Sequence, residues 1–273
     1  QTSFIGVCRK IKQWVALNGF KYIGLGTTKK TYIIQGSSFV DVTPIRATTS
    51  AGDVTFAATN GSSTITVTDV AHNAFKNDFV TFSGAASLGG LITAAVLNQE
   101  YEIDTVPSTS TFTITAKDTS GNTVIANASD TGNGGSSVVG AYQISVGQDI
   151  AVPGGGWGSG DWGDGTWGTG AGTTVTNTLR LWSLDNFGED LVLNPRLGGI
   201  YFWDATSPTT RAAELSTISG AADPPSESLQ IVVSTQDRHV LAIGCNPFGS
   251  SNIDLMQIRW CDQENVLDWR PRT

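Results

Sequence analysis

The sequence predicts an all-β fold in which partial β-propeller blades carry an inserted small antiparallel β domain, either a sandwich or a barrel. Three observations support this fold class. The 273 residues include 32 glycines, and only 15% of the residues are charged. Strand-forming Val, Ile, Thr and aromatic residues alternate with turn residues, and helical periodicity is scarce. Finally, three stretches of the chain repeat one pattern of paired apolar strands.

In each repeat, a glycine-punctuated or apolar strand is followed by a second apolar or aromatic strand. The paired strands are residues 22–27 and 31–34, residues 190–194 and 199–204, and residues 241–246 and 256–260. The first and third copies end in Asp-x-x-Pro, at Asp41 and Asp268. Small antiparallel sheets that cannot bury both faces alone are typical of propeller blades. Closed propellers need about four to eight blades, so we expect this chain to be a fragment of a longer protein.

The repeats divide the chain into four predicted regions. These are a blade segment at 1–45, an inserted β domain at 46–126, a Gly/Trp-rich connecting loop at 127–178 and further blade segments at 179–273. Residues 9–17 suit either a short helix or a strand leading into a blade. The insert shows five alternating strands, at 53–57, 63–68, 78–82, 100–104 and 111–115. Its predicted core is Val54, Phe56, Ile65, Val67, Phe79, Tyr101, Ile103, Phe112 and Ile114.

The connecting loop contains three tryptophans at intervals of five, Trp157, Trp162 and Trp167. This spacing matches neither the helix nor the strand period, so we place them on successive turns. They are candidate subunit contacts, with packing inside the chain and ligand stacking as alternatives. The same tract spells Gly-x-Gly-x-x-Gly without the flanking strand and helix of a dinucleotide site. We therefore predict no cofactor.

The titratable residues predict neither a catalytic site nor a metal site. His72 and His239 are too few for a multi-histidine metal centre. We expect His239 to bond a turn carboxylate. The three cysteines, Cys8, Cys245 and Cys261, lie in apolar runs without Cys-x-x-Cys spacing, so we expect reduced and buried thiols.

Several carboxylates flank the predicted blade strands, namely Glu189, Asp190, Asp204, Asp237 and Asp268. A pair of them could in principle serve glycoside hydrolysis. Most lie beside Gly, Asn or Pro, which favours turn capping instead. Structural ion pairs are expected between Arg196, Arg259 and Arg270 and the carboxylates of Asp204, Asp262 and Asp268.

The net charge of −8 is unevenly distributed. Residues 1–50 carry seven Lys or Arg against one acid, and the remainder carries nine basic against 23 acidic side chains. This balance argues against the phosphate-neutralising surface on which nucleic-acid affinity depends. We expect a solvated acidic surface that aids solubility, and a surface that lets DNA pass without binding is the alternative. No long apolar run or signal-peptide pattern is present, so we predict no membrane insertion from this segment.

Four runs of the chain, residues 180–191, 194–204, 237–246 and 258–265, together with 23–46 and 51–115, resemble a family of tailed-bacteriophage tail proteins. The resemblance is strongest to the nozzle or tail-tube protein of short-tailed phages. It implies a virion component, assembled in the host cytoplasm, with six copies forming a ring around the DNA exit channel. Adaptor or portal proteins and fibre proteins would be its neighbours, genomic DNA would pass through non-specifically, and no catalytic residues are implied. A host-surface or glycan-binding tail module is the alternative, and a propeller glycosidase is a more distant one.

Overall fold

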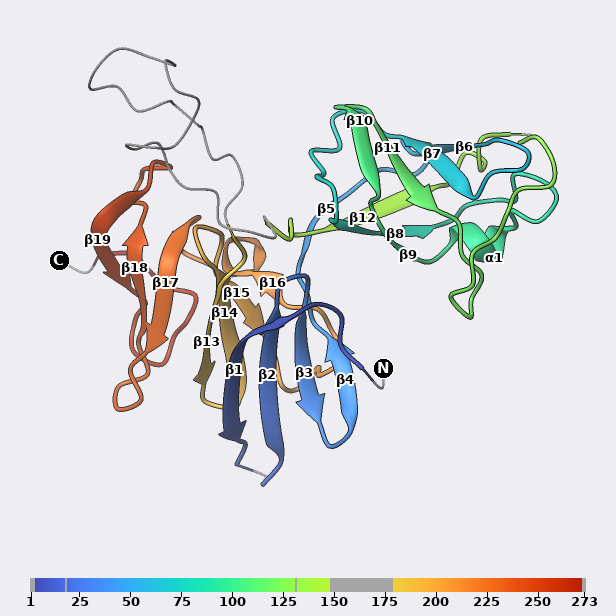
Figure 1. Ribbon diagram of the computed structural model, residues 1–273. Coiled ribbons are helices and arrows are strands. Elements are labelled where there is room, and N and C mark those ends of the chain that lie inside the picture. The colour runs from blue at the N-terminus through green and yellow to red at the C-terminus, as the bar shows by residue number, and fades with distance from the viewer. Residues whose placement is uncertain (1–2, 18, 131, 148–178, 272–273) are drawn as a thin grey trace, which may run out of the picture. The chain divides into compact units, whose positions relative to one another are not determined.

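The computed structural model describes residues 3–17, 19–130, 132–147 and 179–271 (Figure 1). Within them, five antiparallel sheets and one short α-helix account for the regular structure, apart from a single 3₁₀ turn. The all-β prediction is confirmed. The chain divides into two compact units. We call residues 1–42 with 146–273 the blade unit, and residues 43–145 the inserted unit.

The blade unit contains three sheets, each built as an up-and-down meander. Blade 1 consists of β1 (Cys8–Val15), β2 (Lys21–Thr27), β3 (Thr31–Gln35) and β4 (Ser38–Asp41). Blade 2 consists of β13 (Trp182–Phe187), β14 (Asp190–Pro195), β15 (Tyr201–Trp203) and β16 (Ala213–Glu214), followed by the 3₁₀ turn Leu215–Thr217. Blade 3 consists of β17 (Ser228–Val233), β18 (Val240–Cys245) and β19 (Asp254–Trp260).

These sheets contain the strand pairs that the sequence repeat predicts. Within residues 9–17, which suited a helix or a strand, residues 9–15 form most of β1. Its side chains alternate across the sheet, and Trp14 packs into the unit while Val15 is exposed. At the β3–β4 turn, Gly36 has a φ of +62° in a two-residue hairpin loop, a conformation that favours glycine.

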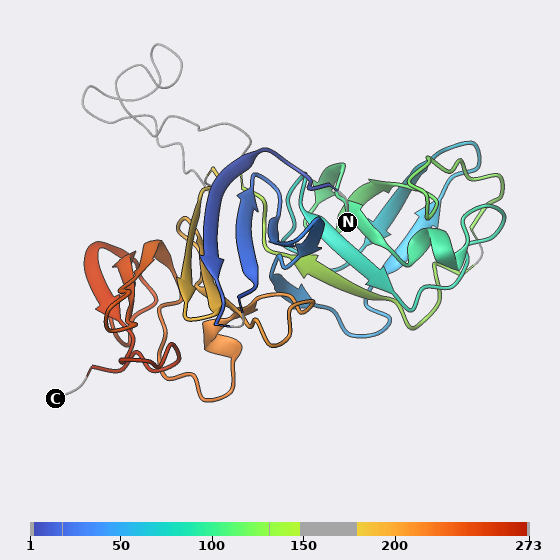
Figure 2. The ribbon, with the colours of Figure 1, turned by 90° about the horizontal axis from the view of Figure 1, so that it is seen from below.

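The three blades pack against one another in chain order. The first strand of each blade contacts the first strand of the next, so β1, β13 and β17 follow one another (Figures 1 and 2). Gly26 on β2 allows this close approach, because a Cβ atom there would lie 2.6 Å from the indole ring of Trp182. Blade 2 is thus covered on both faces, and its residues Leu191, Val192 and Leu193 are fully buried.

The inserted unit consists of two four-stranded antiparallel sheets. One has the order β10-β11-β7-β6, with β10 (Thr105–Ser108), β11 (Thr111–Thr115), β7 (Thr64–Thr68) and β6 (Thr55–Ala58). The other has the order β5-β12-β8-β9, with β5 (Ile45–Thr48), β12 (Val139–Gln143), β8 (Phe79–Ser83) and β9 (Glu100–Glu102). Thr93 caps the N-terminus of the helix α1 (Ala94–Leu97), and its side chain accepts a hydrogen bond from the Val96 amide.

All nine residues predicted for the core of the insert are buried, at 4% exposure or less. Eight of them belong to one cluster, in which the rings of Phe56 and Phe82 meet edge to face. Along β7, the buried Ile65 and Val67 alternate with exposed threonines, and along β11 the buried Phe112 and Ile114 alternate with half-buried threonines. This alternation is what places one face of each sheet in the core.

The boundary at residue 126 is wrong for this unit, because the structure adds residues up to Ser145. β12 lies inside the predicted connecting loop, yet it is the central strand between β5 and β8. Gly134 reaches the core as well, since a Cβ atom there would lie 2.6 Å from the Phe56 ring. Because the stretch before β12 is rich in glycine, the sequence pattern does not indicate that the domain continues to Ser145.

Candidate functional site

The centre of the blade unit is held by one carboxylate that contacts the first strand of both neighbouring blades. Asp185 on β13 forms a 2.6 Å ion pair with Lys12 Nζ on β1. Its other oxygen accepts a 2.9 Å hydrogen bond from the Val233 amide on β17. Only 16% of the Asp185 side chain is exposed. A charge-assisted contact of this kind fixes both the distance and the register between blades.

Two tryptophans join blade 1 to blade 2. Trp14 Nε1 donates to the carbonyl of Glu189 at 2.8 Å, and Trp182 Nε1 donates to the carbonyl of Thr27 at 2.7 Å. The Trp14 ring also meets the ring of Trp203 edge to face, with centroids 6.3 Å apart. Each indole therefore combines a large buried surface with a satisfied polar atom, which makes the blade contact specific.

The Asp-x-x-Pro motif of the first repeat supplies a further link between blades. Asp41 at the end of β4 contacts Lys30 Nζ at 2.7 Å and Arg211 Nη1 at 3.2 Å. Lys30 is fully buried, and Arg211 belongs to the segment that leads into β16 of blade 2. The neighbouring Ala212 amide donates to the Val42 carbonyl at 3.0 Å. Asp41 therefore balances a buried cation and ties two blades together.

At each end of the blade series, one sheet face is left open in the described residues. We define the blade-3 face by the side chains that share a register across its strands, which are Val232, Leu241, Ile243, Ile258 and Trp260. Val232, Ile258 and Trp260 are 40%, 49% and 61% exposed. The opposite face of the same sheet, including Ile231 and Ala242, is buried against blade 2.

Blade 1 has a matching open face. We define the blade-1 face by Ile11, Gln13, Val15, Ile23 and Ile34. Ile11 and Val15 are 59% and 57% exposed. The N-terminal segment covers part of this same face. Leu25 and Tyr32, which are in register with Ile11, are buried, and the Phe4 ring lies 5.7 Å from the ring of Phe39, which is in register with Ile34. Exposed apolar patches of this kind, rimmed by polar residues, mark interaction surfaces.

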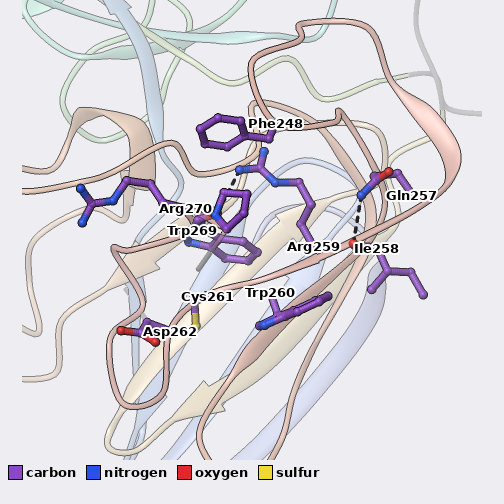
Figure 3. Close-up of a pocket in the computed structure, with 10 residues that line it drawn as sticks. Phe248, Gln257, Ile258, Arg259, Trp260, Cys261, Asp262, Trp269 and Arg270 are labelled. Carbon is purple, nitrogen blue, oxygen red and sulfur yellow. Dashed lines mark hydrogen bonds between the residues drawn. The ribbon is translucent and has the colours of Figure 1, made fainter. Parts of the chain in front are cut away.

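A hollow of about 300 Å³ lies along β19, and its lining is drawn in Figure 3. The exposed side chains of Trp260, Phe248 and Arg270 line it, together with the buried residues Arg259 and Trp269. Arg259 packs over the Phe248 ring at 5.8 Å and pairs with Asp223 at 2.8 Å. The guanidinium of Arg259 is thus held in place by the protein, and the aromatic rings provide the open surface of the hollow.

The carboxylates that flank the blade strands serve mostly as caps. Asp190 accepts a hydrogen bond from the Ala205 amide, and Asp204 accepts from the Thr206 amide and hydroxyl. Glu189 accepts from the Leu17 amide at 2.6 Å. Burial raises the pKa of Asp190, and the nearby charges of Asp204 and Glu189 raise it further against the Ala205 hydrogen bond.

The arginines that were expected to form ion pairs behave differently from one another. Arg270 pairs with Asp268 at 2.7 Å, and this contact holds the pKa of Asp268 at about 2. Arg259 pairs with Asp223 instead of the expected carboxylates, because the loop before β17 returns across the end of β19. The Arg196 side chain is exposed.

Two expectations for single residues are wrong. His239 bonds the Cys261 carbonyl through Nδ1 at 2.8 Å rather than a turn carboxylate, so Nδ1 carries a proton. Cys8 is exposed, as are the three residues that follow it at the start of β1, where a register shift between Cys8 and Lys10 interrupts the pairing with β2. Cys245 and Cys261 are buried free thiols whose pKa values are raised by burial. Trp157, Trp162 and Trp167 lie outside the described residues.

The residues that link the blades, Lys12, Asp185, Lys30 and Arg211, were not singled out from the sequence. One signal was available for Asp185, because it lies between the apolar residues Leu184 and Phe187 of a strand, and a charge that is largely buried requires a partner. The partner itself lies on another blade, far away in the sequence.

Within the described part of the chain, no group of three or more His, Cys, Asp or Glu side chains is arranged to hold a metal ion. No helix found there is long and apolar enough to cross a membrane.

Comparison with known proteins gives little further guidance. No protein-family model matches the chain, and no curated protein matches it. Among solved structures, an endosialidase of phage phi92 aligns with 96% of this chain, at 13% sequence identity and a TM-score of 0.27. The chain spans 37% of the length of that protein. At this TM-score the alignment does not define a shared fold.

Proposed function

We propose that the chain is a structural component of a bacteriophage virion tail, in a nozzle or tail-tube subunit that forms part of a ring around the DNA exit channel. The family resemblance of its blade and insert sequences supports this proposal. The main observation in its support is that charged side chains connect the blades of the blade unit to one another. Asp41 and Asp185 each connect two or more blades, which suits a rigid scaffold.

The uneven charge is consistent with the same role. The acids outnumber the bases beyond residue 50, and such a surface does not retain DNA phosphates. Open apolar faces at both ends of the blade series suit a protein that works inside an assembly. Adaptor or portal proteins and fibre proteins are the proposed neighbours, and the host cytoplasm is the proposed place of assembly.

Labelling of intact particles would test the tail assignment. Antibodies raised against the inserted unit, residues 43–145, would be applied to virions that contain the chain and located by electron microscopy. We expect the label at the tail. The control is the same antibody after absorption with the free inserted unit. Labelling of the capsid alone, or of no particle, would contradict the proposal.

We also propose that the chain is not an enzyme, because the acids near the blade strands are occupied as caps and links. Purified protein incubated with polysaccharides, including polysialic acid, should release no reducing ends. Turnover that disappears in both Asp190→Asn and Asp204→Asn would identify a glycosidase and overturn this proposal.

Glycan binding is a second candidate function, and the hollow along β19 is the observation that favours it. Trp260 and Phe248 are 61% and 54% exposed, and flat aromatic surfaces of this kind stack on sugar rings. A glycan array would test this function. Binding that is lost in Trp260→Ala and retained in Phe75→Ala, an exposed aromatic of the inserted unit, would support it.

A further inference from the structure

Blade 3 has one strand fewer than the two blades before it. In blades 1 and 2 the third strand is paired on both sides, with β4 as the outer partner of β3 and β16 as the outer partner of β15. The third strand of blade 3 is β19, and no strand among the described residues pairs with its outer edge. β19 is therefore an edge strand at a position where the other two blades have an inner strand.

The exposure of the third strands follows this difference. Tyr32 and Ile33 of β3 are at most 1% exposed, and Tyr201 and Trp203 of β15 are also buried. In β19 every apolar side chain is exposed, at 49% to 89%, namely Leu255, Met256, Ile258 and Trp260. Proteins commonly protect an edge strand with Lys or Pro, and β19 contains neither. An apolar edge of this kind favours pairing with another strand.

The residues that follow β19 do not supply the missing strand. In blade 1, β4 leads directly into the Asp-x-x-Pro motif at Asp41. In blade 3, the corresponding residues turn back on themselves, since the Asp262 amide donates to the Asp268 carbonyl at 2.7 Å. The Trp269 amide then donates to the Ala222 carbonyl at 2.9 Å. This stretch of backbone is therefore committed to partners other than β19.

The hollow described above lies along the unpaired edge of β19. The consecutive residues 257–262 line it. Successive side chains of a strand point to opposite faces of the sheet, so a space bordered by all of them follows the edge of the strand rather than one face (Figure 3). A fourth strand of blade 3 would occupy this position.

The backbone of β19 offers hydrogen-bonding groups on the same side. The Cys261 amide donates to the first residue of β18 at 3.0 Å, and alternation along an antiparallel strand makes Arg259 face β18 as well. The amides and carbonyls of Ile258 and Trp260 therefore face the open edge. The Ile258 carbonyl accepts a 3.1 Å hydrogen bond from the side chain of its own neighbour, Gln257 (Figure 3). A side-chain amide thus takes the place of the amide that a paired strand would provide.

We propose that the outer edge of β19 binds an extended segment of another polypeptide, which pairs with Ile258 and Trp260 as the fourth strand of blade 3. In strand addition, main-chain hydrogen bonds give affinity and side-chain pockets give specificity. The rings of Trp260 and Phe248 line the hollow, so the segment should place an apolar side chain there. Only a polypeptide presents amides and carbonyls at strand spacing. The inference depends neither on the tail assignment nor on what lies outside residues 1–273.

A peptide copied from a fourth strand of this chain serves as the probe. Residues 36–42 contain β4, which pairs with the third strand of blade 1. The peptide carries Asp41→Asn, because the same antiparallel pairing would bring Asp41 close to Asp254 at the start of β19. Anisotropy of the labelled peptide, titrated with the purified full chain, should show saturable binding. The same peptide with Val40→Pro should bind at least about tenfold more weakly, since proline cannot donate to a strand partner.

Substitutions in β19 separate backbone pairing from side-chain contact. Ile258→Pro removes an amide that faces away from β18, which an edge strand tolerates, and should weaken peptide binding at least about tenfold. Ile258→Val keeps the amide and is the matched control, with affinity within about twofold of the unaltered chain. Gln257→Ala frees the Ile258 carbonyl and should strengthen binding about 2- to 10-fold, the usual net effect of one hydrogen bond. Circular dichroism would show that each variant is folded.

Hydrogen exchange measured by NMR gives a readout that needs no substitution. Bound peptide should slow the exchange of the Ile258 and Trp260 amides. The Arg259 amide, which already faces β18, should change little. A ligand that only stacks on the Trp260 ring would not produce this alternation along the strand.

Three results would overturn the proposal. The first is the absence of saturable binding, or equal binding of the Val40→Pro peptide. The second is binding that Ile258→Pro leaves intact, which would place the peptide elsewhere on the chain. The third is a dimer of the peptide-free chain that Ile258→Pro abolishes in sedimentation, which would mean that a second copy occupies the edge.

Discussion

Asp41 and Asp185 show at the scale of single residues how carboxylates hold separate blades together. Each is mostly buried, and each contacts groups from more than one blade. Burial strengthens the Coulomb attraction between the charges, but it also costs desolvation free energy. Only well-placed partners offset that cost. These acids therefore stabilise one arrangement of the blades as well as the strands that carry them.

Replacing Asp41 should destabilise the blade unit strongly. Asp41→Ala removes the carboxylate 2.7 Å from Lys30 Nζ, whose side chain is fully buried. Breaking a buried ion pair by removing one partner costs about 3 to 5 kcal/mol. Urea denaturation followed by tryptophan fluorescence would measure the loss. Arg270→Ala is the control, because its exposed pair should change stability by less than about 1 kcal/mol. Equal effects of the two substitutions would refute a structural role for Lys30 and Asp41.

The Asp268–Arg270 pair predicts a specific titration. Asp268 has a pKa of about 2 in the folded chain, against an ordinary value of 3.8, chiefly because Arg270 donates hydrogen bonds to it. A lowered pKa stabilises the folded state above pH 3.8, and this contribution is lost as the pH falls through about 2. NMR titration of the Asp268 carboxyl should show a return toward 3.8 in Arg270→Ala. An unchanged titration would exclude the ion pair in solution.

At the scale of elements, β12 decides where the inserted domain ends. It pairs with β5 on one side and β8 on the other, so its removal would split one of the two sheets. Tyr142 on β12 also enters the core, and its hydroxyl donates to Asp69 at 2.6 Å. A central strand contributes pairing on both edges and side chains to the core, and a domain this small cannot lose both.

A comparison of two fragments tests the role of β12. Residues 43–145, expressed alone, should be soluble and unfold cooperatively. Residues 46–126 match the domain predicted from the sequence and should be disordered or aggregate, because β5 and β8 then expose unpaired edges. Circular dichroism and thermal unfolding would distinguish the two. Cooperative unfolding of the shorter fragment would show that β12 is dispensable.

The whole molecule consists of two units that each have their own core. Such units unfold separately unless a large interface couples them. Differential scanning calorimetry of the full chain should therefore show two transitions. Phe112→Ala empties a fully buried position of the inserted unit and should cost about 3 to 5 kcal/mol.

This cost should lower one transition by more than about 10 °C and leave the other in place. Asp41→Ala should shift the remaining transition, because Asp41 belongs to the blade unit. A single transition that moves with both substitutions would show that the two units unfold as one.

The sequence by itself determined the fold class, the second and third strands of each blade and the core of the insert. Those features depend on local patterns, since alternating apolar residues mark a half-buried strand wherever it lies. Only the tertiary structure decided how the first strands of the blades join. β13 carries the polar residues Ser183, Asp185 and Asn186, which are unusual in a central strand. The charge of Asp185 is satisfied only by Lys12 and the Val233 amide, which belong to the two neighbouring blades. Long-range partners leave no trace in local periodicity, and for that reason the links between blades and the two open faces appeared only in the folded chain.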